Sequence, residues 1–177
     1  MSGPVGEPDG LPRGVRLGVD VGDVRVGLAR SDLDGLIATP VETLERDSAT
    51  RRVLETALEL DARVIMVGLP RSLSGAEGAA ADKARAFAEE LVTLLEASAP
   101  QTEVRLIDER LTTVSAHKAL HSSGRRGRRH RQVVDQVAAV MILQQALDLE
   151  RSSGRRGGEL VEGANRDTER DRTEEDR

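Results

Sequence analysis

Residues 15–28 read Val-Arg-Leu-Gly-Val-Asp-Val-Gly-Asp-Val-Arg-Val-Gly-Leu. In this stretch aliphatic side chains alternate with glycine or charged residues on both sides of Gly22-Asp23. Alternation with a period of two is typical of a β-strand, and two such runs around a glycine-containing turn predict a hairpin. We therefore expect the folded part of the chain to begin with two antiparallel strands, and a third short strand is expected near residues 37–44.

The spacing of apolar residues changes after this hairpin. An unbroken apolar run at residues 64–67 predicts a buried central strand. Apolar residues at helical spacing predict the covering helices. These patterns place further strands at 64–67 and 104–107, and helices from about 48, over 74–94, over 113–121 and over 132–150. The order predicts an α/β fold with a mixed five-stranded sheet covered by helices on both faces.

The two ends of the chain differ in composition from the middle. Residues 1–13 are rich in glycine and proline, and residues 152–177 are mostly Gly, Arg, Glu and Asp. Such segments have too few apolar side chains to form a core, so both are expected to be disordered. One domain is therefore expected over residues 14–151.

The composition excludes several classes of function. Of the 177 residues, 1% are aromatic and none is cysteine. A single phenylalanine, Phe87, argues against nucleic-acid binding by base stacking on aromatic platforms. The lack of cysteine excludes disulfides, zinc–thiolate sites and thiol nucleophiles. With neither a signal-peptide pattern nor an apolar run long enough to cross a bilayer, a cytoplasmic protein without membrane association is expected.

Acidic residues stand where predicted strands and a helix end or begin. Asp20 lies near the end of the first strand, Asp108 and Glu109 follow the last strand, and Asp135 falls in the first turn of the last predicted helix. Ligands bind beyond the carboxyl ends of parallel strands. Carboxylates converging there would repel one another without a cation, and oxygen ligands suit Mg²⁺ or Mn²⁺. Such a site can cleave a phosphodiester with two metal ions.

Each acidic residue also has a simpler interpretation. Asp20 could be a turn residue, Asp135 could compensate the helix dipole, and the acidic pair after the last strand could bind Arg110. The alanines at 138–139, one turn after Asp135, favour close approach of the last helix to the sheet. Strand periodicity does not choose between the two acids that end the last strand.

Basic residues supply candidate phosphate contacts. Although the net charge is −5, five arginines crowd into a short glycine-containing segment, at Arg125, Arg126, Arg128, Arg129 and Arg131. A local basic patch can attract a polyanion even in an acidic protein, although a solvated linker is the alternative. Arg25 and Arg110 could likewise bind phosphates through their guanidinium forks, or form ordinary surface ion pairs.

Four stretches, taken in order, resemble the YqgF/RuvX family of RNase H-like proteins. They are Asp-Val-Gly-Asp-Val-Arg-Val-Gly-Leu-Ala-Arg-Ser-Asp at 20–32, Val-Gly-Leu-Pro at 67–70 followed by Gly75, Asp-Glu-Arg-Leu-Thr-Thr at 108–113, and Asp-Gln-Val-Ala-Ala-Val-Met-Ile-Leu-Gln at 135–144. One such motif would be weak, but four in order are highly specific. Arginine stands here where the family usually has a lysine-rich loop, which keeps the charge.

The resemblance implies an RNase H-like fold and a metal-dependent nuclease that processes the 5′ end of the 16S ribosomal RNA precursor. Some members resemble Holliday junction resolvases instead, so structured RNA and branched DNA are both candidate partners, bound by a monomer or a homodimer. The family's catalytic and metal-binding carboxylates, which would hold Mg²⁺ (or Mn²⁺), map onto Asp20, Glu109 and Asp135. Glu109 is preferred to Asp108 on this resemblance alone.

Two hypotheses from other classes are less well supported. Proteins of the actin and sugar-kinase kind also begin a strand with Asp-x-Gly, but that architecture needs two such domains and this chain is too short for them. A ribosome-assembly factor without catalytic activity is the other alternative. The presence of all three acidic residues argues against it.

Overall fold

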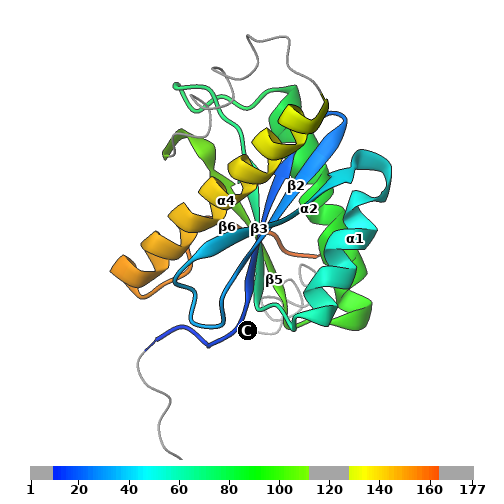
Figure 1. The fold of residues 1–177 in the computed structure, drawn as a ribbon. Coiled ribbons are helices and arrows are strands. Elements are labelled where there is room, and N and C mark those ends of the chain that lie inside the picture. Colours follow the sequence, from blue (N-terminus) through cyan, green and yellow to red (C-terminus); the bar gives the residue numbers. More distant parts are fainter. Residues whose placement is uncertain (1–9, 112–127, 164–177) are drawn as a thin grey trace, which may run out of the picture.

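The computed structural model describes residues 10–111 and 128–163, in which one mixed sheet lies between helices (Figure 1). The strands run in the order β3-β2-β1-β4-β5-β6. Their bounds are β1 Arg16–Val21, β2 Arg25–Ser31, β3 Ala38–Glu45, β4 Val64–Leu69, β5 Glu103–Asp108 and β6 Glu159–Leu160. The expected hairpin is confirmed, because β1 and β2 pair antiparallel around a turn closed by Gly22 N–H donating to the Arg25 carbonyl. The strands β1, β4 and β5 are parallel.

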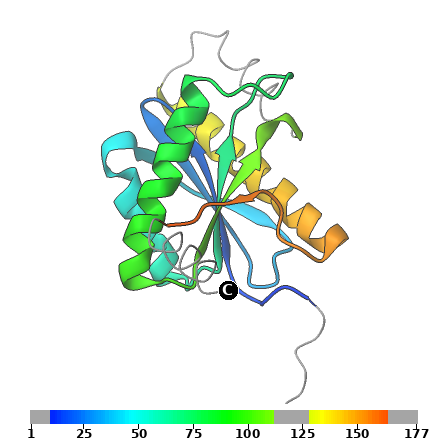
Figure 2. The ribbon, with the colours of Figure 1, turned by 180° about the vertical axis from the view of Figure 1, so that it is seen from behind.

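Helices cover both faces of the sheet, as the sequence predicts. The helices α1 (Arg46–Glu59) and α2 (Ala79–Ser98) pack on one face, which is the nearer face in Figure 2. The long helix α4 (Arg128–Ser153) crosses the opposite face (Figure 1). None of the helices in the described ranges is long and apolar enough to span a bilayer.

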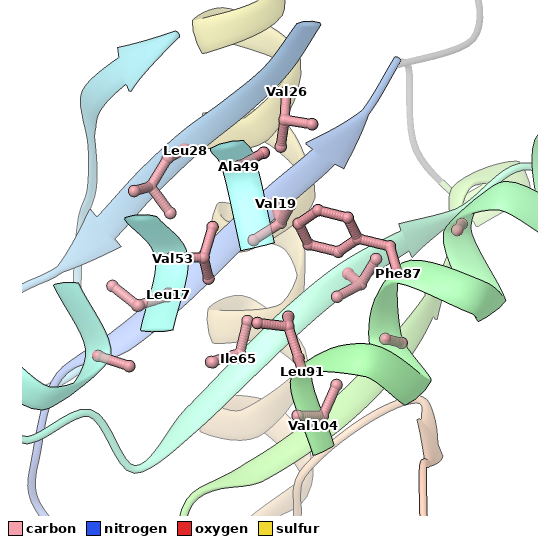
Figure 3. Packing of buried hydrophobic residues seen from close by; sticks show 14 of the residues in the cluster. Leu17, Val19, Val26, Leu28, Ala49, Val53, Ile65, Phe87, Leu91 and Val104 are labelled. Atoms are coloured by element: carbon pink, nitrogen blue, oxygen red, sulfur yellow. The ribbon is translucent and has the colours of Figure 1, made fainter. Parts of the chain in front are cut away.

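Two hydrophobic clusters result, one on each face of the sheet. In the larger cluster, Phe87 and Leu91 of α2 point towards Val19 and Ile65 of the sheet (Figure 3). The smaller cluster lies under α4 and includes Met66, Ile142 and Leu143. Because strand side chains alternate between faces, every second residue of β1, β2, β4 and β5 points towards α4. These α4-facing positions carry the polar residues of the candidate site.

The structure corrects the expectation of five strands to six. The additional strand, β6, pairs antiparallel with the outer edge of β5 and falls within residues 152–177, where composition predicts disorder. Arg156 explains the difference: its side chain is buried and donates to Glu150 of α4 at 2.7 Å, while Glu159 pairs with Arg85 of α2 at 3.0 Å. Arg156 and Glu159 thus form ion pairs with helices of the domain, although the composition around them is typical of a solvated tail. Residues 1–9 and 164–177 lie outside the described part of the chain.

The start of the last helix also differs from the expectation. It begins at Arg128 rather than near residue 132, so three of the clustered arginines, Arg128, Arg129 and Arg131, belong to its first turn instead of a loop. Asp135 consequently lies about two turns inside the helix. Compensation of the helix dipole is strongest within the first turn, so that simpler interpretation of Asp135 is not supported. The helix expected over 113–121 falls outside the described residues.

Glycines in the sheet let α4 approach its backbone closely. A Cβ atom at Gly18 would lie 2.6 Å from Leu143 Cβ and 2.9 Å from the Ala139 carbonyl oxygen, and one at Gly27 would clash with the carbonyl oxygen of Asp135. On the helix side, the alanines at 138–139 are fully buried, as expected for a close contact. The position of Asp135 is therefore set by the absence of a side chain at Gly27.

We predict that Gly27→Ala destabilises the protein by about 2–3 kcal/mol or more, because the new methyl group meets helix backbone that cannot move without shifting α4. The free energy of unfolding, measured by urea denaturation, checks this. Gly78→Ala is the matched control, since a Cβ there meets no atom within 4 Å, and it should cost less than about 1 kcal/mol. Equal losses in the two variants would show that the close contact at Gly27 does not limit stability.

Candidate active site

Asp20 faces α4 at the carboxyl end of β1. Leu17 and Val19 belong to the cluster on the opposite face, whereas Arg16 and Gly18 contact α4 through Glu150 and Leu143. The alternation of strand side chains therefore turns Asp20 to the α4 side. The residue is only 3% exposed. Burial of a carboxylate is costly unless hydrogen bonds or opposite charge compensate it, so this position is unusual for a simple turn residue.

Glu109 follows β5 and also lies on the α4 side. It begins the short helix η1 (Glu109–Leu111), and it is 2% exposed. A Cβ at Gly68 would lie 2.6 Å from Glu109 Oε1, so the Glu109 carboxylate sits over the backbone of Gly68 on β4. Because Val19 of β1 is in register with Val67 of β4, the next residues along these parallel strands are Asp20 and Gly68. Glu109 thus lies over β4, the strand next to β1, which carries Asp20.

Asp135 reaches the same end of the sheet from α4. Its carbonyl oxygen lies over Gly27, which is the cross-strand partner of Asp20. Its carboxylate accepts a hydrogen bond from Arg25 Nε at 3.0 Å, with 16% of the Arg25 side chain and 23% of the Asp135 side chain exposed. The structure therefore brings together the three acidic residues that the sequence singled out, over neighbouring strands.

These carboxylates are suitable for a hard cation but are not arranged around one. Their donor atoms are all oxygen, and two of the three side chains are deeply buried. Among the described residues, however, no group of three or more acidic or histidine side chains has the geometry to hold a metal ion.

Asp108 lies on the other face of β5. It accepts hydrogen bonds from Arg110 Nη2 at 2.6 Å and from the Arg110 backbone N–H at 2.9 Å, and Arg71 Nη1 lies 3.5 Å away. The Arg110 guanidinium holds the pKa of the Asp108 carboxyl below its usual value. Ile107 packs in the cluster under α4, so Asp108 points to the other face, whereas Glu109 lies over Gly68 on the face that carries Asp20.

Arg71 lies beside Asp108 at the end of β5, and it was not among the residues predicted from the sequence. It directly follows the Val-Gly-Leu-Pro motif and, besides its contact with Asp108, pairs with Glu77 at 3.1 Å. Within the described residues its Nε is the buried side-chain nitrogen or oxygen that has no hydrogen-bond partner. Its position immediately after a strand of the predicted sheet was the available signal.

The expected phosphate-binding arginines fall into three groups. Arg25 and Arg110 are both engaged with carboxylates, those of Asp135 and Asp108. Arg128 and Arg129 form part of the first turn of α4, at the end of the helix nearer to Asp135. Arg125 and Arg126 lie outside the described residues. The N-terminal end of a helix attracts anions through its dipole and its free backbone N–H groups.

Comparison with known proteins identifies relatives over most of the chain. A family described as "RuvX: Holliday junction resolvase" matches residues 14–149. A protein of Clavibacter sepedonicus is 55% identical over 152 residues, covering 84% of this chain and 91% of its own length. One from Streptomyces coelicolor is 53% identical over 155 residues, covering 86% and 90%. Both are described as "Putative pre-16S rRNA nuclease".

Solved structures show the same fold at low sequence identity. Thermus thermophilus RuvC in complex with a Holliday junction substrate superposes with a TM-score of 0.51 and 14% identity, covering 83% of this chain and 99% of that one. A second Thermus thermophilus RuvC structure gives a TM-score of 0.50. These similarities confirm the predicted RNase H-like fold class.

The ion pairs of Asp108 predict a pH-dependent contribution to stability. The folded-state pKa lies below the usual value, so the stabilisation is present at neutral pH and is lost as the pH falls from about 4 towards the folded-state pKa. Asp108→Asn should therefore lower the free energy of unfolding by about 1–2 kcal/mol at pH 7 and by less at pH 3. Urea denaturation at the two pH values measures this.

Glu89→Gln is the control for that comparison, since Glu89 is exposed on α2 and has no ion pair among the described residues. Its small effect should be similar at pH 7 and pH 3. If Asp108→Asn were equally harmless at both pH values, the pairs with Arg110 and Arg71 would not stabilise the end of β5.

Proposed function

This chain belongs to the RuvX family, and we propose that it is a metal-dependent nuclease that cleaves phosphodiester bonds in the 5′-end processing of pre-16S ribosomal RNA during ribosome biogenesis. The observation that carries this proposal is the position of Asp20, Glu109 and Asp135 over neighbouring strands, on the α4 face and at the carboxyl end of the parallel strands. The relatives' printed descriptions support RNA as the substrate.

Each acidic residue has a defined role in this proposal. Asp20, Glu109 and Asp135 would hold Mg²⁺ or Mn²⁺, which suit oxygen ligands. Two such ions would supply an activated water and stabilise the leaving oxygen of the phosphodiester. The deep burial of Asp20 and Glu109 keeps their carboxylates in a fixed, largely dehydrated setting. Electrostatic interactions there are much stronger than in water.

Arginines around these carboxylates would bind the phosphates of the substrate. Arg25 begins β2 and Arg110 follows β5. Arg128 and Arg129 begin the helix that carries Asp135. Arg125 and Arg126 precede them in the sequence and complete the proposed set. Phosphate contacts of this kind supply affinity and orientation without sequence specificity. Recognition would therefore depend on the shape of a structured RNA.

A resolvase of branched DNA is the second candidate function, favoured by the description of the matching family. Cleavage of RNA and of DNA junctions would use the same carboxylates. A resolvase cuts two strands symmetrically and should act as a homodimer, whereas RNA processing is compatible with a monomer. In either case we propose a cytoplasmic enzyme. Retention of all three acidic residues argues against an assembly factor that lacks catalysis.

We predict that the purified protein cleaves a precursor 16S RNA fragment with Mg²⁺ or Mn²⁺, and that EDTA abolishes cleavage. Asp20→Asn should lower the cleavage rate about a thousandfold or more while the protein stays folded, because metal-assisted charge stabilisation contributes several kcal/mol and each 1.36 kcal/mol is about tenfold. A four-way DNA junction incubated in parallel distinguishes the two candidate substrates. Full activity in EDTA would contradict the proposed metal dependence.

The assignment of Glu109 rather than Asp108 gives a second prediction. Because Glu109 shares a face with Asp20, Glu109→Gln should lose about a hundredfold or more in rate at saturating Mg²⁺. Asp108→Asn removes the same charge from the neighbouring residue and should stay within about tenfold of the natural protein. The opposite ranking of the two cleavage rates would show that Asp108 is the catalytic carboxylate.

A further inference from the structure

The ion pair between Arg25 and Asp135 follows directly from the docking of α4. Arg25 and Gly27 lie two residues apart on β2 and therefore on the same face of the sheet. The turn of α4 that contains Asp135 rests on Gly27, which places the Asp135 carboxylate next to Arg25, with 3.0 Å between Arg25 Nε and Asp135 Oδ2. The pair is thus a fixed consequence of backbone packing rather than an incidental surface contact.

Partial burial makes this pair costly to break without replacement partners. Less than a quarter of either side chain is exposed, so water compensates incompletely for a lost partner. A cation beside Asp135 and an anion beside Arg25 would each compensate for the lost ion pair and so favour separation. A metal ion and a phosphate group of the nucleic acid would supply both at the same moment.

We propose that Arg25 is a positioning residue that holds Asp135 in the metal-free protein and exchanges it for a phosphate of the substrate. RNA binding would then release Asp135 for metal coordination, and metal binding would release Arg25 for RNA. The coupling must be reciprocal, because each ligand changes the affinity of the other by the same factor. This inference rests on the proposed function, since it takes Asp135 as a metal ligand.

Arg110 provides an internal comparison. It also pairs with a carboxylate near the end of the sheet, at 2.6 Å, but its partner Asp108 points away from the α4 face. Release of Arg110 would free a phosphate-binding group without freeing a carboxylate of the candidate site. Of these two arginines, Arg25 is the one whose ion pair would link phosphate binding to an acidic residue of the candidate site.

The first test measures RNA affinity in EDTA, where no cleavage occurs. Fluorescence anisotropy with a labelled RNA hairpin compares the natural protein with Asp135→Asn, Arg25→Gln and the double variant. We expect Asp135→Asn to tighten binding by about three- to tenfold because it frees Arg25, and this gain should largely disappear when Arg25 is already Gln. Equal gains with and without Arg25 would overturn the proposal.

Asp23→Asn is the matched charge control for this cycle. Asp23 lies in the same hairpin as Arg25, is exposed and pairs with Lys83 instead. Its neutralisation removes one negative charge near the site, so any gain in RNA affinity should be the same in both Arg25 backgrounds. Thermal unfolding checks that every variant is folded. Should Arg25→Gln fail to fold, Arg25→Lys keeps the charge without the guanidinium fork and should give a smaller coupling.

The second test measures Mn²⁺ affinity in the absence of RNA, by electron paramagnetic resonance. Arg25→Gln should bind Mn²⁺ about three- to tenfold more tightly than the natural protein, and more tightly than Arg110→Gln, which loses the same charge. Equal tightening by the two substitutions would overturn the proposed role of Arg25 while leaving the metal site intact. If neither the natural protein nor Arg25→Gln bound Mn²⁺, the proposed metal-dependent function itself would fail.

Discussion

Close contact between α4 and the backbone of the sheet fixes the arrangement of the candidate site. It exists because Gly18 and Gly27 have no side chains to hold the helix away, and because small alanines face them from the helix. One larger side chain at either glycine would displace α4, and with it the turn that carries Asp135. The contact therefore does more than bury apolar surface, since it also sets which polar groups meet at the site.

Charged residues lie under α4 at both ends, and the two ends differ in how that charge is arranged. At the end remote from the candidate site, Glu150 is buried between Arg16 and Arg156, which lie 3.2 Å and 2.7 Å from its carboxylate oxygens. Buried ion pairs of this kind specify a geometry, because removing one partner leaves an uncompensated charge. At the site end the buried acids are Asp20 and Glu109, and acidic residues from three separate elements gather there. Like charges placed close together repel one another, so such a cluster favours binding of a cation and does not by itself stabilise the fold.

Asp108 and Glu109 show how adjacent residues acquire different roles. Asp108 joins a series of ion pairs that runs through Arg71, Glu77 and Arg85 to Glu159 of β6. These pairs tie the end of β5 to the loop after β4, to α2 and to the last strand. Glu109, one residue later, lies under α4 instead, with its carboxylate over the backbone of Gly68. The network fixes the backbone from which Glu109 extends, so the structural acid supports the proposed catalytic acid.

The hairpin, the order of the elements from β1 to β5 and the three candidate acidic residues could be predicted from the sequence, because these depend on local periodicity and on residues at strand ends. The sequence also predicted the close approach of the last helix from the paired alanines. Three features depend on packing between distant segments: Glu109 shares a face with Asp20, Arg25 binds Asp135 across 110 residues of sequence, and β6 completes the sheet. Alternation within a strand predicts which residues share a face only once the register and the packed partners are known. Charged residues, moreover, have no periodicity that distinguishes a solvated tail from a segment whose arginines bind acids elsewhere on the domain.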